Sequence, residues 1–229
     1  MGGDSIMHIY AFGSVCRGEV TPDSDIDLLA LVDGHDSRFS ERSYSIYSYK
    51  KMRKMWEEGS PFAWHLFLES RLLFAEDGTD FLEELGQPMR YRKYVADCIK
   101  FKDVFNSARN SLETGRESSI FDLSAVFLSL RNISTCYSLG VLNAPMFSRH
   151  AALSLTDPLS LPLSSTSYAV LERARILCTR GAGAPVDDQE AEAVMDEFDR
   201  IDSWMTSIVE SAREHERIHQ SGGSPAKIS

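Results

Sequence analysis

Residues 11–32 read AFGSVCRGEVTPDSDIDLLALV, and this stretch indicates both a fold and a site. A short apolar run ends at Gly13-Ser14, a polar loop follows, and Asp25 and Asp27 stand at the head of a second apolar run. Successive side chains of a strand point to opposite faces, so the two aspartates are expected on one face. Carboxylates held that close repel each other, and a hard divalent cation such as Mg²⁺ compensates the repulsion. The sequence therefore predicts a metal–phosphate site at the start of a strand.

The glycine and serine that end the first apolar run fit the same site. Gly13 allows a positive φ or a close approach of the backbone to a ligand. Ser14 is predicted to cap a short helix over residues 15–19, whose first N–H groups would face a phosphate. Arg17 lies in the same loop, and its guanidinium could meet a triphosphate. The alternative interpretation is an acidic hairpin turn in an ordinary α/β domain.

Residues 13–27 resemble the signature of the polymerase-beta-type nucleotidyltransferases: Gly-Ser, a further glycine, then Asp-x-Asp on the next strand. The sequence of this motif is most similar to that of the small bacterial members, which include antibiotic nucleotidyltransferases and minimal nucleotidyltransferases paired with helical partners. The resemblance implies a nucleotide-binding set, a catalytic pair of carboxylates and a pair of Mg²⁺ ions. The nucleotide-binding set is Gly13, Ser14, Arg17 and Ser24, and the ions would be bound by Asp25 and Asp27.

The resemblance also implies a third metal-binding carboxylate, supplied by a neighbouring strand. We predict that strand over residues 62–69, FAWHLFLE, because the segment is rich in aromatic residues. His65 and Glu69 would then share one face. His65 stands where the resemblance would place an aspartate, whereas Glu69 has the chemistry but comes at the end of the segment. Both are candidate catalytic residues, and the alternative is a core histidine beside a solvated glutamate.

Composition restricts the partners of the chain. Its 229 residues carry a formal net charge of −10 and give a pI near 5.1, so the basic face that a long nucleic acid requires is not expected. An acidic surface suits a cationic small substrate. The cysteines Cys16, Cys98, Cys136 and Cys178 are too widely spaced for a zinc site, and the last three are expected to be buried thiols. No signal peptide or membrane span is predicted, and we expect a cytoplasmic protein.

The pattern along the chain predicts an α/β (α+β) domain with a mixed sheet over residues 1–88, an all-α helical bundle over 89–219 and a disordered tail over 220–229. Strands are expected over residues 7–12, 25–32, 62–69 and 72–74, and a strand or the approach to a helix over 44–49. Helices are expected over residues 50–58, 79–86, 92–113, 119–139, 146–154, 163–179 and 188–215. The resemblance implies that the helical bundle binds the acceptor and closes over the nucleotide.

Together these features predict Mg²⁺-dependent transfer of a nucleoside monophosphate from a nucleoside triphosphate to a hydroxyl of a small, aminoglycoside-like molecule, with release of pyrophosphate. One alternative is nucleotidyl transfer (AMPylation) to a partner protein, as in the toxin-neutralising minimal members. The other is a catalytically silent module that binds nucleotide. The sequence leaves open which nucleotide is used, what accepts it and whether the protein forms a homodimer.

Overall fold

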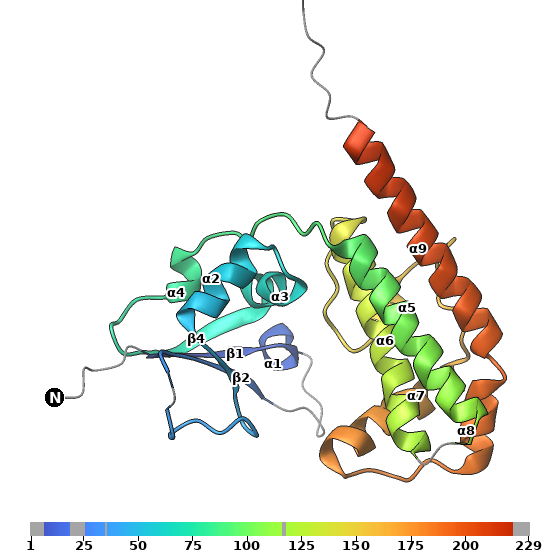
Figure 1. Cartoon of the computed structure of the whole chain (residues 1–229). Coiled ribbons are helices and arrows are strands. Elements are labelled where there is room, and N and C mark those ends of the chain that lie inside the picture. The colour runs from blue at the N-terminus through green and yellow to red at the C-terminus, as the bar shows by residue number, and fades with distance from the viewer. Residues whose placement is uncertain (1–6, 19–25, 35, 116–117, 222–229) are drawn as a thin grey trace, which may run out of the picture. The chain divides into compact units, whose positions relative to one another are not determined.

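The structure, a computed structural model, describes residues 7–18, 26–34, 36–115 and 118–221. The chain divides into two compact units, Met1–Arg92 and Lys93–Ser229 (Figure 1). The first unit contains a mixed sheet with helices, and the second is made of helices. This arrangement confirms the predicted fold class.

The sheet of the first unit has four strands in the order β3-β2-β1-β4. The strands are β1 (Met7–Phe12), β2 (Asp27–Val32), β3 (Ser45–Tyr47) and β4 (Ser70–Ala75). β1 runs antiparallel to both β2 and β4, whereas β2 and β3 are parallel. The strands predicted from the two apolar runs therefore form the centre of the sheet. Within the described residues, the second of them begins at Asp27 rather than at residue 25.

One face of the sheet carries the core of the first unit. Tyr10 and Phe12 of β1 lie on this face together with Leu29 and Leu31 of β2, and all four are buried. The helices α2 (Tyr49–Glu57), α3 (Pro61–Glu69) and α4 (Phe81–Glu84) cover this face (Figure 1). Since Asp27 precedes Leu29 by two residues, its side chain belongs to the same face, at the end of the strand.

The strand predicted over residues 62–69 is wrong, because this segment is the helix α3. The Ser60 hydroxyl accepts a hydrogen bond from the Ala63 N–H, and Pro61 occupies the first turn, where its missing N–H costs nothing. Ala63 and Leu66, three residues apart, are both fully buried against the sheet. The strand next to β1 is instead β4, which includes the short strand predicted over residues 72–74.

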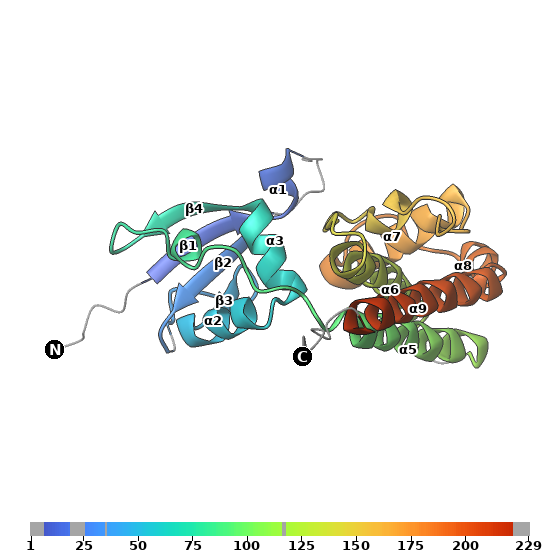
Figure 2. The same ribbon diagram turned by 90° about the horizontal axis from the view of Figure 1, so that it is seen from above.

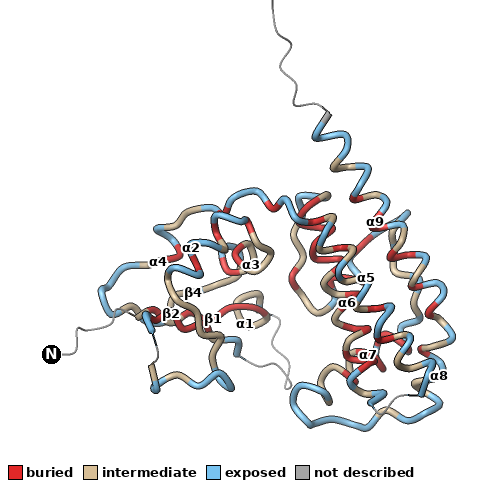
Figure 3. The backbone as a smooth tube through the Cα atoms, in the orientation of Figure 1, coloured by how far each residue is buried: buried red, intermediate tan, exposed pale blue. Residues whose placement is uncertain are grey.

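The second unit is built around α6, which is buried along most of its length (Figure 3). Its elements are α5 (Tyr94–Glu113), α6 (Ser119–Gly140), the short 3-10 helix η1 (Ala151–Ser154), α7 (Ser165–Arg180), α8 (Asp188–Met195) and α9 (Phe198–Ser221). α5 packs against α6 and α9, and α7 packs against α6 on another side (Figure 2). The helices predicted over 92–113, 119–139 and 163–179 are confirmed to within two residues at each end.

Two predictions in the second unit are wrong in detail. The helix expected over residues 188–215 is two helices, α8 and α9, separated at residues 196–197. The Glu197 carboxylate accepts hydrogen bonds from Ser164 and Ser167 at the start of α7, which holds the break in place. The helix expected over 146–154 is only the single turn η1. α9 also continues to Ser221, two residues into the predicted tail, and residues 222–229 lie outside the described part.

All four cysteines are free thiols. Cys98 and Cys136 are buried as predicted, but Cys178 is exposed because it lies near the solvated end of α7. Among the described residues, the helices are all too short or too polar to cross a membrane.

The turn between α2 and α3 allows a prediction about stability. Gly59 has φ +61°, and a Cβ there would lie 2.1 Å from the carbonyl oxygen of Met89. Gly59→Ala is expected to lower the free energy of unfolding by about 3 kcal/mol, because alanine is strained at this positive φ and its methyl group would overlap the backbone of Met89. Gly86→Ala is the matched control, because Gly86 has φ +63° and open space around it; its expected loss is about 1 kcal/mol. Urea unfolding of both variants measures the difference, and equal losses would contradict the packing argument.

Candidate active site

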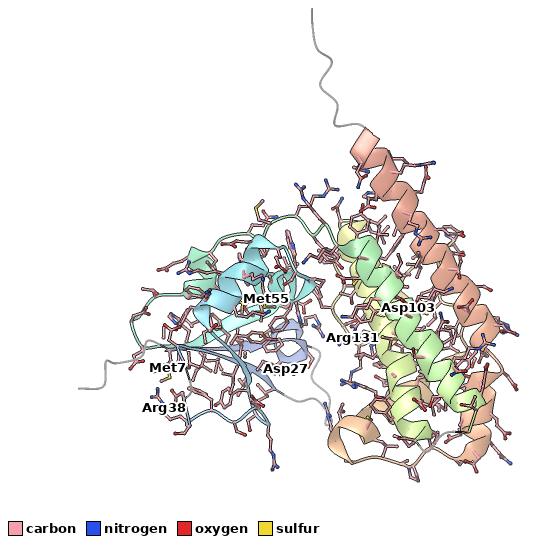
Figure 4. All side chains as sticks on the ribbon, viewed as in Figure 1. Met7, Asp27, Arg38, Met55, Asp103 and Arg131 are labelled. Carbon is pink, nitrogen blue, oxygen red and sulfur yellow. The ribbon has the colours of Figure 1, made fainter. Side chains whose placement is uncertain are left out.

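The candidate site lies at the end of the sheet where β1 stops and β2 starts. Phe12 is paired with Asp27 on one side and with Ser70 on the other. The chain then turns at Gly13, whose N–H donates a hydrogen bond to the carbonyl oxygen of Glu69 over 3.2 Å. Figure 4 shows Asp27 at this end of the sheet and Met7 at the other. The turn after β1, the start of β2 and the junction of α3 with β4 therefore converge.

Gly13 and Asp27 are in close contact at this end of the sheet. Gly13 has φ +79°, and a Cβ added to it would lie 2.7 Å from Oδ2 of Asp27. The carboxylate therefore occupies space that only a glycine leaves open. Asp27 itself is an exposed residue at the start of β2. Asp25 and Ser24 lie outside the described residues, and the predicted shared face of Asp25 and Asp27 stays a prediction.

The short helix predicted after Gly13 is present as α1 (Ser14–Arg17), with one correction. Ser14 was predicted to cap the helix, but it is the first helical residue. Gly13 takes the capping position, without a side-chain hydrogen bond, and Gly18 ends the helix in the left-handed conformation. Cys16, which the sequence interpretation did not include in the site, ties α1 back to β1 through a contact between its Sγ and the Ala11 carbonyl oxygen.

Three side chains predicted for the site meet beside this turn. Nη1 of Arg17 forms an ion pair with Oε2 of Glu69, and Nε2 of His65 lies 3.0 Å from the same oxygen. His65 and Glu69 share a face, as predicted, but they do so as positions i and i+4 of α3. The His65 ring also packs edge-on against Phe12, which anchors the cluster to β1.

The Glu69 carboxylate is ionised in this cluster. Burial raises the pKa of Glu69, but the close contacts with His65 and Arg17 outweigh burial and hold the pKa below its ordinary value. The side chains of Arg17 and Glu69 are only 18% and 16% exposed. Arg17, which was predicted to meet a triphosphate, is therefore engaged with an internal carboxylate in this structure.

The position of the implied third carboxylate also changes. β4 is the strand next to β1, and its residues, Ser70 to Ala75, include no carboxylate. Glu69 comes immediately before β4, so it is the acidic side chain that this strand brings nearest to the turn. His65 is a residue of α3, so it does not take the place of an aspartate on the sheet.

At this end of the sheet, some of the side chains are suitable ligands for a hard divalent cation. Asp27 offers carboxylate oxygens over the space kept free by Gly13, which is the chemistry that Mg²⁺ prefers. Within residues 7–18, 26–34, 36–115 and 118–221, no group of three or more His, Cys, Asp and Glu is arranged to hold a metal. The predicted pair needs Asp25, which is not among those residues.

The Glu69 cluster gives a prediction about pH. Because the pKa of Glu69 is lowered on folding, its ionised form stabilises the protein above the ordinary glutamate range, and this stabilisation is lost as pH falls through the folded-state pKa. Glu69→Gln is expected to lower the free energy of unfolding by about 1–2 kcal/mol at pH 7, since Arg17 loses its partner.

Urea unfolding from pH 7 down to pH 3 measures this effect. The difference between wild type and Glu69→Gln should shrink as the pH falls, whereas Glu84→Gln on the exposed part of α4 should change little at any pH. A difference that is constant over this range would contradict the assignment of an ionised Glu69.

Comparison with known protein families identifies the first unit. Residues 4–95 match the family model described as the nucleotidyltransferase domain, and the match ends in the first turn of α5. This match is consistent with the predicted polymerase-beta-type nucleotidyltransferase superfamily. The domain is that of a transferase of nucleotidyl groups. Domains of this family generally use divalent metal ions. No curated protein matches the chain.

Proposed function

We propose that the protein transfers a nucleoside monophosphate from a nucleoside triphosphate to a hydroxyl group of a small molecule and releases pyrophosphate. The proposal is supported by one observation above all: the Asp27 carboxylate faces the Gly13 turn at the end of the sheet of a nucleotidyltransferase domain. A tight glycine turn beside a carboxylate is suited to a polyphosphate with its counter-ions.

In the proposed reaction the acceptor oxygen forms a bond to the α-phosphorus while the bond from that phosphorus to the leaving pyrophosphate breaks. Gly13 leaves room for the phosphates to approach the turn, Ser14 contacts them, and Arg17 and Ser24 are further nucleotide contacts. The proton of the acceptor hydroxyl leaves to a base, for which Glu69 and His65 are the candidates in reach of the turn.

Asp25 and Asp27 would hold the Mg²⁺ ions. When bound, the ions supply neutralisation of the charge that develops on the phosphates during in-line displacement. Asp27 keeps its carboxylate exposed at the head of β2 for this purpose, and the rigid pairing of β2 with β1 fixes the position of its backbone.

A small, cationic acceptor such as an aminoglycoside is favoured by the net charge of −10 and by the helical unit that follows the transferase domain in the same chain. The four free thiols suit a reducing compartment, and we expect the protein in the cytoplasm. The second candidate, a silent nucleotide-binding module, is favoured by one observation, the absence of a carboxylate on β4.

The test is an assay of the purified protein with Mg²⁺, each of ATP, GTP, CTP and UTP, and a panel of hydroxyl acceptors that includes aminoglycosides and protein. We expect pyrophosphate to appear with one acceptor class, together with an equal amount of acceptor whose mass has increased by one nucleoside monophosphate. Modified protein without a modified small molecule would favour the partner-protein alternative. Nucleotide binding without pyrophosphate release would favour the silent module.

A further inference from the structure

A groove runs between α5 and α6 in the helical unit, and none of the residues assigned to nucleotidyl transfer lines it. Its volume is about 550 Å³, within the usual range for small-molecule sites. Most of the side chains that line it are apolar: Ala96, Ile99, Val104, Ala108, Phe121 and Ala125. Phe121 is 61% exposed, so a large apolar ring lies open to a ligand. The groove can accept an apolar body of modest size.

Asp122 gives this groove its chemistry. It lines the groove, yet it is only 7% exposed. Within the described residues, no hydrogen bond or ion pair joins the Asp122 carboxylate to a partner, and the Asp122 backbone N–H donates to the Ser118 carbonyl oxygen. Asp122 lies in the first turn of α6, at the edge of the groove, and a cation in the groove can reach its carboxylate. Among the residues that the structure describes, none pairs with this carboxylate, so the groove offers an acid to a cationic ligand.

The other charged residues of the groove do not supply that counter-ion. Lys100 lines the groove, but its ammonium lies over the ring of Phe101, 5.6 Å from the ring centroid. Asp103, labelled in Figure 4 on α5, is exposed and adds a second carboxylate to the lining. A buried acid and an exposed acid beside a single lysine leave the groove attractive to a cation.

We propose that the groove between α5 and α6 binds a small organic cation, a protonated amine or guanidinium carried on an apolar body, with Asp122 as its counter-ion. The apolar body lies against Val104 and Phe121, and the charged end reaches the Asp122 carboxylate. Asp103 contributes a weaker attraction from the open side. The site lies entirely within the helical unit and does not rest on the proposed transfer reaction.

The experiment uses three protonated amines, benzylamine, 2-phenylethylamine and agmatine, with 2-phenylethanol as the neutral match for the second. Amide chemical shifts of the isotope-labelled full chain are followed during titration. We expect at least one amine to shift signals from α5 and the start of α6, and 2-phenylethanol to bind at least tenfold more weakly than 2-phenylethylamine. Asp122→Asn should weaken amine binding at least tenfold, and Asp103→Asn, from the same groove, by no more than about threefold.

A second measurement separates binding from a structural role. If Asp122 is a binding residue, Asp122→Asn removes a largely buried charge that has no described partner, and it should raise the midpoint of thermal unfolding by about 2–4 °C without ligand. A purely structural Asp122 would give a lower midpoint. The proposal is overturned if none of the three amines binds, if amine and alcohol bind equally, or if Asp122→Asn binds as the wild type does. It is also overturned if a second copy of the chain covers the groove, which would be seen as a dimer that the Phe121→Asp variant no longer forms.

Discussion

Asp27→Asn is expected to lower the rate of pyrophosphate release about a thousandfold, the largest effect of any single change in this protein. Asparagine keeps the shape of the side chain but removes the negative charge that the proposed function assigns to metal binding. A thousandfold loss corresponds to about 4 kcal/mol of transition-state stabilisation, which is in the range supplied by a catalytic metal ion. The measurement is the initial rate of pyrophosphate release at saturating nucleotide and acceptor.

The same variant should fold normally, because Asp27 is exposed and its backbone pairing with Phe12 does not depend on the carboxylate. Asp33→Asn is the matched control: Asp33 is an exposed aspartate that follows the other end of β2, and its loss should change the rate less than threefold. Asp25→Asn combined with Asp27→Asn should leave no measurable release. Release that survives in the double variant would contradict the proposed function.

Gly13→Ala should lower the rate about a hundredfold. The added methyl group would lie 2.7 Å from Oδ2 of Asp27, so the carboxylate has to move away from the turn. A displacement of that kind in a site that depends on alignment lowers rates by about two orders of magnitude. The positive φ of +79° adds strain of about 1–2 kcal/mol, which would appear as a loss of stability.

Gly18→Ala separates strain from displacement. Gly18 ends α1 with φ +74°, close to that of Gly13, but nothing lies within 4 Å of the place of its Cβ. Gly18→Ala should lose a similar amount of stability and keep the rate within about threefold of the wild type. If both variants lose activity equally, the shape of the turn matters and the contact with Asp27 does not.

Much of the fold follows from patterns that are strong in the sequence. β1 and β2 are near-continuous apolar runs on either side of a loop, and such runs form the centre of a sheet whatever surrounds them. The helices α5, α6 and α7 show apolar residues at helical spacing and are long enough for that spacing to be unambiguous. These elements were predicted to within two residues at their ends.

The segment over residues 62–69 shows why shorter elements were predicted wrongly. It is apolar on nearly every side, so neither the strand period nor the helix period stands out. The signal for a helix is present in Ser60-Pro61, a capping residue followed by a proline at the first helical position. The break at residues 196–197 had no local signal, because it depends on hydrogen bonds to Ser164 and Ser167, which are far away in the sequence.

The sequence predicts which residues belong to the candidate site, but it does not predict the contacts among them. The motif placed Gly13 and Asp27 at neighbouring ends of two strands, and the structure brings them together. Arg17 and Glu69 are 52 residues apart, so no local pattern could show that they form an ion pair. Asp25 and Ser24 lie outside the described residues, and their assignments stay predictions.

The pairing of Arg17 with Glu69 has a consequence for how a nucleotide would enter. In the free protein the arginine already has an anion beside it, supplied by the chain itself. An incoming phosphate that binds Arg17 therefore has to displace the Glu69 carboxylate, and part of its binding free energy is used for this displacement. The ion pair would thus hold the Arg17 guanidinium in position before the nucleotide binds, although it would weaken nucleotide binding. Ligands with a high negative charge would be favoured, because they compete best with Glu69 for Arg17.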